Sequence, residues 1–224
     1  MRRFHCEGLA QAKDGDHLTL SDETRRHVRV LRLEAGAEVL LFDGEGHLAH
    51  AALTDEGVKV ATITSVPPVR PALHLILGMP KRTKVDGIVR MATEIGAASV
   101  RMVRVARSVA AAEEKKRARL ARVVREACRQ SERLHGMQLH FHSVLKEAID
   151  ALPNECSRYV AWARSHERVV PTGDERCIAV GPEGGFTDGE LTRLQEAGFK
   201  HLSLSATILR TETAAIVALA RLAL

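Results

Sequence analysis

Two short loops near the end of the chain carry the residues best suited to bind a ligand or to do chemistry. Residues 181–186 read Gly-Pro-Glu-Gly-Gly-Phe, and residues 208–214 read Ile-Leu-Arg-Thr-Glu-Thr-Ala. Each loop follows a short apolar run typical of a buried strand and precedes a segment with helical spacing. Because α/β domains bind ligands at the carboxyl ends of their strands, the two loops predict one ligand site.

The first loop is rich in glycine, which allows a tight turn and leaves backbone amides accessible. Thr187 and Glu190 have the spacing of a capping box for the helix that follows. The Gly-x-x-Gly-Gly spacing fits neither a phosphate-binding loop nor a dinucleotide fingerprint, which disfavours a nucleotide-dependent oxidoreductase. By itself, this loop is also compatible with an ordinary turn from strand to helix.

The second loop places three polar side chains at the start of the last helix. Thr211 is predicted to cap this helix, and Glu212 would interact favourably with its positive end. Arg210 is different, because a cation beside a helix N-terminus is electrostatically disfavoured. Stability alone does not account for Arg210, so we treat it as a candidate functional residue.

The elements that position these loops fall on either side of a proline-rich linker at residues 66–71. Before it, Ser21 is predicted to cap a helix that runs to Leu33, and strands are expected over residues 37–42 and 58–66. A hairpin turn is expected at residues 43–46. We therefore predict a small β-rich domain over residues 1–70.

Apolar strands and helices alternate after the linker, which predicts a mostly parallel sheet covered by helices over residues 71–224. The expected strands are 73–78, 100–105, 159–163, 178–181 and 201–204. The expected helices are 83–95, 113–134, 187–197 and 211–222.

The basic charge is concentrated in one region. The chain has a net charge of +5, whereas residues 1–70 carry 9 basic and 11 acidic side chains, and residues 101–133 carry 11 and 4. Such a patch is the footprint of a polyanion contact. Aromatic residues make up only 3%, too few for a sheet that stacks bases. This favours contacts to the RNA backbone, with a target base taken out of its stack individually.

The predicted helix 113–134 carries an apolar stripe on one side and arginines on the other. Its arginines suit either a solvated face or phosphate contacts, and both interpretations stay open. The stripe consists of Leu120, Val123, Val124, Ala127 and Leu134; the opposite side holds Arg122, Arg125 and Arg129.

The cysteines and the paired histidines give little support for a catalytic or metal site. The four cysteines form no CxxC pair and have no arranged histidine partner, so we expect reduced thiols and no nucleophilic cysteine. His140 and His142 would share one strand face but lack a third ligand, so no metal is expected. No apolar run approaches the about 18 residues that span a bilayer, and no secretory signal is seen, so we expect a cytoplasmic protein without a membrane partner.

With residues 126–133, Glu-Ala-Cys-Arg-Gln-Ser-Glu-Arg, the two loops resemble the RsmE family of the SPOUT superfamily. These enzymes methylate N3 of a uridine in 16S ribosomal RNA. The resemblance covers essentially the whole chain, and residues 27–32 match the family's His-x-x-Val-Leu-Arg segment. It implies a trefoil-knotted SPOUT domain (71–224) behind a PUA-like RNA-binding barrel (1–70). It also implies a homodimer that uses S-adenosylmethionine on the small ribosomal subunit during ribosome biogenesis.

The resemblance also implies site residues. Arg210 would face the negative charge that develops on the uracil imide, with Glu212 orienting it or accepting a proton through water. The implied cofactor-binding residues are Gly181, Pro182, Glu183, Gly184, Gly185, Leu204, Ser205, Ile208, Leu209, Arg210 and Thr213. The implied RNA-binding residues are Arg29, Arg32, Arg107, Ser108, Glu126, Gln130 and Arg133.

The sequence departs from the family at a few positions. Ser205 and Thr207 stand where family members usually have Gly and Arg, and smaller departures are Met91 for Lys and Gly136 for Pro. The first two favour an alternative, a degenerate relative that binds RNA without catalysis. A second alternative is a methyltransferase for a uridine in another RNA.

Overall fold

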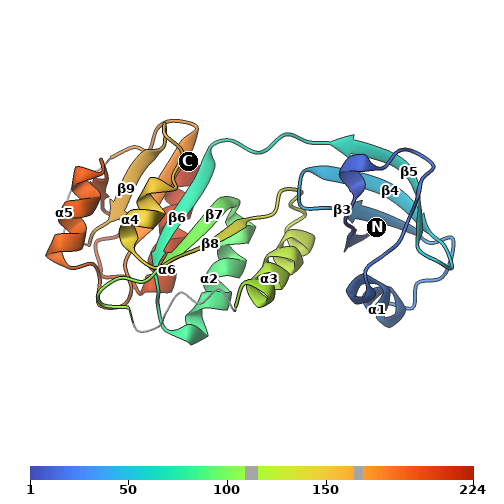
Figure 1. Cartoon of the computed structure of the whole chain (residues 1–224), viewed down its shortest axis with the longest axis horizontal. Helices are drawn as coiled ribbons and strands as arrows, with labels where there is room; N and C mark the ends of the chain where they lie inside the picture. Colours follow the sequence, from blue (N-terminus) through green and yellow to red (C-terminus); the bar gives the residue numbers. More distant parts are fainter. Residues whose placement is uncertain (109–115, 164–168) are drawn as a thin grey trace. The chain divides into compact units, whose positions relative to one another are not determined.

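The computed structural model describes residues 1–108, 116–163 and 169–224. The chain divides into two compact units (Figure 1). One consists of Met1–Pro68 together with Arg125–Gly136, and the other of Val69–Val124 together with Met137–Leu224. Helix α3 (Arg117–Gln130) therefore contributes residues to both units.

The N-terminal unit is built on a five-stranded sheet in the order β1-β3-β4-β5-β2. The pairing of β1 with β3 is parallel, and the other pairings are antiparallel. The turn predicted at residues 43–46 joins β3 to β4 as a hairpin, which confirms that prediction. The strands are β1 (Arg2–His5), β2 (His17–Leu18), β3 (Glu38–Phe42), β4 (His47–Leu53) and β5 (Val58–Ser65).

A 3-10 turn, η1 (Leu9–Gln11), and helix α1 (Asp22–Val30) complete this unit. The Ser21 hydroxyl accepts a hydrogen bond from the Thr24 amide at 3.2 Å, so the predicted N-cap is confirmed. The predicted extension of the helix to Leu33 is wrong. Arg32 has a φ of 52°, a left-handed conformation in which an α-helix cannot continue.

Helix α3 is also shorter than its apolar pattern predicts. Within the described residues it ends at Gln130 rather than Leu134, because Glu132 adopts a left-handed φ of 58°. Residues 113–115, the predicted start, lie outside the described part of the chain. The stripe itself is confirmed at Leu120, Val124 and Ala127, which are buried.

The C-terminal unit is a six-stranded sheet in the order β11-β9-β10-β6-β7-β8, and each of its pairings is parallel. Strand β10 lies between β9 and β6, both of which precede it in the chain. The strands are β6 (Ala72–Gly78), β7 (Ala97–Val103), β8 (Gln138–His142), β9 (Ser157–Ala161), β10 (Glu175–Val180) and β11 (Lys200–Leu202).

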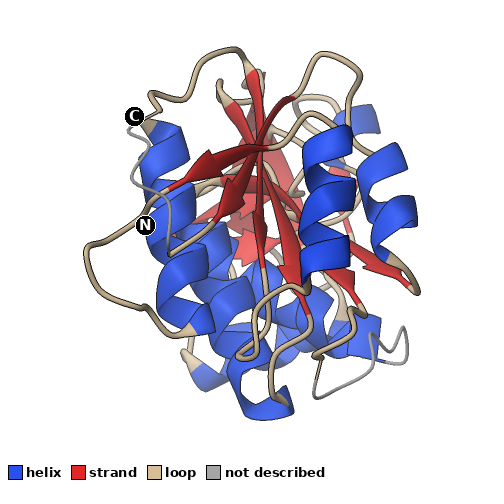
Figure 2. Ribbon diagram, turned by 90° about the vertical axis from the view of Figure 1, so that its left-hand side faces the viewer, coloured by secondary structure: helices blue, strands red, loops and turns tan. Residues whose placement is uncertain are grey.

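Helices cover both faces of this sheet (Figure 2). Helices α2 (Arg82–Ile95) and α6 (Thr211–Ala223) contact each other, and α6 packs on β6 and β10. Helices α4 (Leu145–Asp150) and α5 (Asp188–Glu196) bury Leu145, Leu191 and Leu194 in a core with Ile76 and Ala179. The predicted α/β class is confirmed, although the alternation did not predict α4. The trefoil knot stays a prediction. None of the described helices is long and apolar enough to cross a membrane.

Candidate functional site

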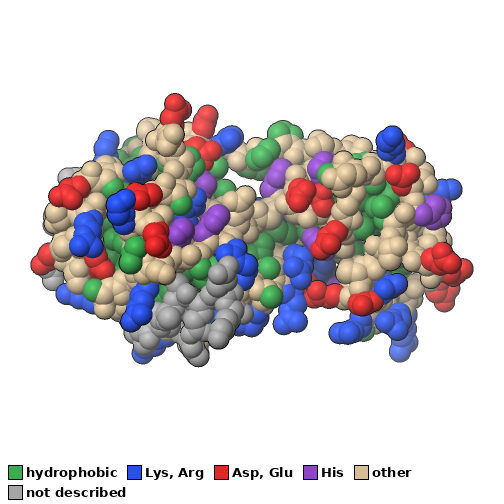
Figure 3. All heavy atoms as spheres, viewed as in Figure 1, with side chains coloured by type: hydrophobic (Ala, Val, Ile, Leu, Met, Phe, Trp, Pro, Cys, Tyr) green, Lys and Arg blue, Asp and Glu red, His purple; other side chains and the backbone are tan. Residues whose placement is uncertain are grey.

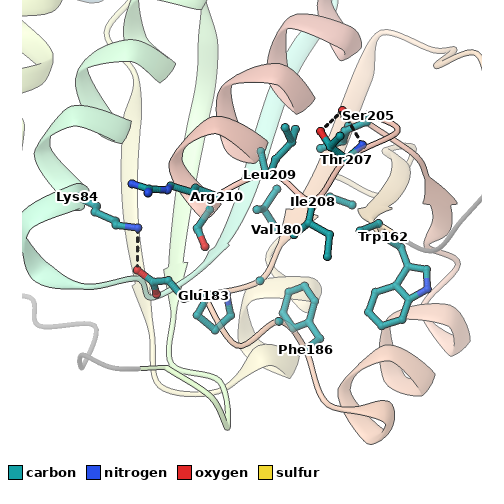
Figure 4. Close-up of a pocket in the computed structure, with 18 residues that line it drawn as sticks. Lys84, Trp162, Val180, Glu183, Phe186, Ser205, Thr207, Ile208, Leu209 and Arg210 are labelled. Carbon is teal, nitrogen blue, oxygen red and sulfur yellow. Dashed lines mark hydrogen bonds and ion pairs between the residues drawn. The ribbon is translucent and has the colours of Figure 1, made fainter.

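A cavity of about 450 Å³ lies at the carboxyl ends of β9 and β10, beside the start of α6 (Figure 4). Both loops singled out in the sequence line it. One of its ends carries charged side chains, among them Lys84, Glu183 and Arg210, whereas Trp162 and Phe186 lie towards the other end. A cavity of this size is typical of sites for small ligands.

The glycine-rich loop turns back on itself in a way that requires glycine. A Cβ on Gly181 would lie 3.1 Å from the backbone of Gly185, and Gly185 itself has a φ of 69°. The Gly185 amide donates to the Pro182 carbonyl at 2.8 Å. The Pro182 ring packs so closely on the end of β6 that a Cβ on Gly78 would meet it at 2.7 Å.

This loop is fixed to its surroundings by two side chains. Glu190 accepts from the Thr187 amide at 2.8 Å, which completes the predicted capping box, and from the Ala106 amide at 2.7 Å. The Arg107 guanidinium donates to the carbonyls of Gly184, at 2.8 Å, and Phe186, at 3.4 Å. The segment that follows β7 is thereby tied to the cavity wall.

The second loop enters α6 differently from our expectation. Thr211 is the first residue of the helix and is buried, so its predicted role as the cap is wrong. Arg210 occupies the cap position in an extended conformation, without a side-chain cap bond. The hydroxyl of Ser205 accepts from the Thr207 amide at 3.2 Å and lies 3.1 Å from the Thr207 hydroxyl. The two departures from the family therefore bond to each other.

The charged end of the cavity is organised by Lys84, which the sequence reasoning missed. Its ammonium lies 2.8 Å from a carboxylate oxygen of Glu212 and 3.2 Å from one of Glu183. The hydrogen bond from Lys84 lowers the pKa of Glu212, and the same bond raises the pKa of Lys84. Burial opposes the ionisation of Glu183, but its own amide, the Lys81 amide and Lys84 outweigh burial and lower the pKa of this carboxyl. The carboxylates and the ammonium are all charged at neutral pH.

Arg210 extends to the same side of the cavity as Lys84 (Figure 4). No hydrogen bond or ion pair joins its guanidinium to another residue in the described part of the chain. Glu212, which we expected to orient Arg210 or to accept a proton through water, bonds to Lys84. Among the described residues that line this end of the cavity, Arg210 is therefore the charged group that is available to a ligand.

Nine of the eleven predicted cofactor-binding residues line the cavity, and Gly184 and Thr213 do not. The nine are Gly181, Pro182, Glu183, Gly185, Leu204, Ser205, Ile208, Leu209 and Arg210. The lining residues that were not predicted to bind the cofactor are Lys84, Ala161, Trp162, Ala163, Val180, Phe186, Thr207, Thr211 and Ala214. Trp162 is the only tryptophan of the chain, and no motif marked it.

The predicted RNA-binding residues are divided between the units. Arg107 and Ser108 belong to the C-terminal unit, where the Ser108 hydroxyl accepts from the Val105 amide at 3.1 Å. The other five belong to the N-terminal unit: Arg29, Arg32, Glu126, Gln130 and Arg133. An ion pair of 3.3 Å between Arg125 and Glu23 joins α3 to α1 there. Basic side chains over α1 are mixed with acidic ones on the face shown in Figure 3.

Glu126, Gln130 and Arg133 interact with other residues of the unit or are partly buried in it, and Gln130 hydrogen bonds to Glu126. Arg129 donates to Glu126 at 2.9 Å, and this bond lowers the pKa of the Glu126 carboxyl. Burial lowers the pKa of the Arg133 guanidinium.

The two histidines considered as metal ligands lie on β8. The rings of His140 and His142 stack there with centroids 6.3 Å apart, and no cluster of three metal-ligating side chains occurs among residues 1–108, 116–163 and 169–224.

Comparisons with known families identify the class. The model of the RNA methyltransferase domain family matches residues 68–223, more than half of the chain, and that of the RNA methyltransferase PUA domain matches residues 20–63. The chain is therefore an RNA methyltransferase family member with an N-terminal PUA-type domain.

Individual relatives narrow the assignment. Ribosomal RNA small subunit methyltransferase E of Mycobacterium bovis is 32% identical over 216 residues, covering 88% of this chain and 82% of that protein. The Bacillus subtilis protein of the same name is 27% identical, covering 98% and 94%. The chain belongs to this family, RsmE, as the motifs predicted.

Solved structures of similar proteins have the same fold. Ribosomal RNA small subunit methyltransferase E of Neisseria gonorrhoeae, bound to S-adenosylmethionine, aligns with a TM-score of 0.87 at 29% identity, covering 98% of this chain and 95% of that one. A methyltransferase of Legionella pneumophila with the same cofactor aligns at 0.86 and 26% identity, covering 98% and 96%.

Proposed function

We propose that this chain transfers a methyl group from S-adenosylmethionine to N3 of one uridine in 16S ribosomal RNA of the small subunit. The observation that carries the proposal is the convergence of the two motif loops on one cavity. The relatives are small-subunit ribosomal RNA methyltransferases, and two similar structures hold S-adenosylmethionine. We propose the cytoplasm, where ribosomal subunits mature, as the place of action.

The residues that line the cavity fit this cofactor. Trp162, Phe186 and Ile208 offer apolar surface to an adenine, and the turn of residues 181–185 brings backbone groups to the cavity wall. Lys84, Glu183 and Arg210 lie at the other end, where the charged methionyl portion and the reacting base would meet. When bound, the cofactor supplies an electrophilic methyl group on a sulfonium.

Arg210 is the residue that we assign to the chemistry. Methylation of N3 requires loss of the N3 proton, which we assign to water as the acceptor, and this loss leaves negative charge on the uracil imide. A guanidinium without another partner among the described residues stabilises that charge and orients the base. Of the described residues that line the cavity, Glu183 is the one carboxylate, and hydrogen bonds from its own amide, the Lys81 amide and Lys84 lower its pKa and keep it ionised. We therefore assign Glu183 and Glu212 to positioning rather than to proton transfer.

Methyl transfer to small ribosomal subunits that lack the modification tests the function. Labelled S-adenosylmethionine should give N3-methyluridine at a single 16S position. Label in another nucleoside or another RNA would replace the proposed substrate. A protein that binds S-adenosylmethionine and the subunit but transfers no label would be the degenerate RNA-binding relative.

We also propose a homodimer, following the family resemblance. Ala215, Ala218, Leu219 and Leu222 of α6 are buried within the chain's own core, so an interface would use other residues. Ile208 lines the cavity yet is 88% exposed, which offers an apolar surface for a partner at the site. Light scattering of the active protein should give twice the mass of the chain, and a fully active monomer would overturn this part of the proposal.

A further inference from the structure

Lys84 occupies an unfavourable position for a cation. It lies in the first turn of α2, which contains no acidic residue, and the positive end of a helix repels an ammonium. Its side chain is only 22% exposed. Helix stability therefore does not explain Lys84, and contacts outside the helix must compensate.

Those contacts come from both loops of the cavity. Glu183 belongs to the turn after β10 and lies 3.2 Å from the ammonium, and Glu212 belongs to the first turn of α6 and lies 2.8 Å away. Glu183 also accepts from the Lys81 amide at 3.3 Å. One end of α2 thus holds two segments that are 29 residues apart in sequence.

We propose that Lys84 is a positioning residue that clamps the two cofactor loops at the spacing the cavity requires. The inference rests on the proposed function, since it assigns S-adenosylmethionine to this cavity. The carboxylates of Glu183 and Glu212 each bind one loop to the same ammonium. Loss of Lys84 therefore frees both loops and leaves the two negative charges without the cation between them. Arg210 keeps its role towards the base, because its guanidinium takes no part in the clamp.

The alternative role for Lys84 is direct contact with the carboxylate of the cofactor. Two ligands separate the two roles: S-adenosylhomocysteine has the amino-acid portion, and methylthioadenosine lacks it. Trp162 lines the cavity and is the only tryptophan, so its fluorescence reports binding of both ligands without RNA.

Lys84→Met should weaken both ligands by a similar factor, about tenfold for two partly shielded ion pairs. Lys84→Arg should recover most of the affinity, because a guanidinium can contact both carboxylates. Lys146→Met, which removes a lysine paired with Asp150 on the exposed side of α4, is the matched control and should bind both ligands as the wild type does. Weakening of S-adenosylhomocysteine alone would show direct contact and overturn the clamp.

The coupling between Lys84 and Glu212 gives a second criterion. The Lys84→Met/Glu212→Gln double variant should lose less affinity than the product of the two single losses, since both changes break one contact. Losses that multiply would overturn the proposal.

Hydrogen exchange of the ligand-free protein tests the clamp independently of the cofactor. Lys84→Met should speed amide exchange in residues 182–186 and 204–212 while leaving the strands β6 and β10 unchanged. Unchanged exchange in both loops would overturn the clamp. If exchange rises but the wild-type protein binds neither ligand, the clamp stands and the proposed cofactor is wrong.

Discussion

The two ends of the parallel sheet hold similar charged residues and put them to different use. At the carboxyl end, Lys84, Glu183 and Arg210 border an open cavity. At the amino end, Glu175 and His74 begin a buried chain of polar contacts, in which the His74 ring lies 2.6 Å from Glu175 and 2.8 Å from the Ser99 hydroxyl. None of these residues lines the cavity at the carboxyl end.

The amino-end chain combines the residue types of a hydrolytic triad without the access that a triad needs. Ser99 is 2% exposed, and its hydroxyl also accepts from Arg101, whose second nitrogen donates to the Ala151 carbonyl at 2.8 Å. Arg70 closes the chain at its other end with an ion pair to Glu175. The amino end is thus a hydrogen-bonded network without access to a cavity, in which only the Nε of Arg101 has no partner among the described residues. At the carboxyl end, among the described residues that line the cavity, Arg210 is the cation available to a ligand.

Of the predictions, substitution of Arg210 should have the largest effect, and it should change catalytic activity only. Arg210→Ala should lower methyl transfer by on the order of 10²–10³-fold, because it removes the group that stabilises the imide charge. Binding of S-adenosylhomocysteine and the free energy of unfolding should stay close to wild type. Single-turnover rates on small ribosomal subunits measure methyl transfer. Arg193→Ala, on the exposed side of α5, is the control. Transfer at a near wild-type rate would remove Arg210 from the mechanism.

Ser99→Ala should produce the opposite pattern. Removing this hydroxyl leaves buried donors of Arg101 and a ring nitrogen of His74 without their partner, which should cost about 2 kcal/mol of unfolding free energy. Methyl transfer at 25 °C should not change. Urea unfolding measures the loss, and Ser143→Ala, at an exposed serine after β8, should leave stability as it is. An inactive but stable Ser99→Ala protein would place chemistry at the amino end.

Lowering the pH should affect the two ends of the sheet differently, through fold stability at the amino end and cofactor affinity at the carboxyl end. Burial lowers the pKa of His74, so between about pH 6.5 and its folded pKa the unfolded state binds a proton that the folded state does not. Stability should therefore fall as the pH drops below about 6.5, by at most about 1.4 kcal/mol per pH unit for this residue. His74→Gln should reduce the slope of unfolding free energy against pH.

Cofactor affinity should behave differently over the same range. The carboxyls of Glu183 and Glu212 have lowered pKa values and Lys84 a raised one, so none of them titrates between pH 6 and 8. Binding of S-adenosylhomocysteine should be nearly constant in that range. Affinity that falls in parallel with stability would show that the two ends are coupled.

The sequence predicted the features that depend on neighbouring residues, and it missed the contacts that depend on the order of strands in the sheet. The capping box of Thr187 and Glu190 follows from residues three positions apart, and the glycine loop follows from one turn. Lys84 reaches Glu183 and Glu212 only because β10 lies between β6 and β9, an order that alternating strands and helices do not encode. Trp162 follows β9 without a motif. The amphipathic pattern of α3 predicted a buried stripe but not that its last turns belong to the N-terminal unit.

Of the predictions, restoring the family's usual glycine at Ser205 should have the smallest effect. In the family a glycine usually stands there, yet the Ser205 hydroxyl accepts from the Thr207 amide and stabilises the turn that leads to Ile208. Ser205→Gly removes this bond and adds backbone freedom, so S-adenosylhomocysteine should bind about two- to threefold more weakly. Titration of Trp162 fluorescence measures the change. A marked gain in affinity would mean that the Ser205 side chain obstructs the cofactor, which would favour the degenerate relative over an active enzyme.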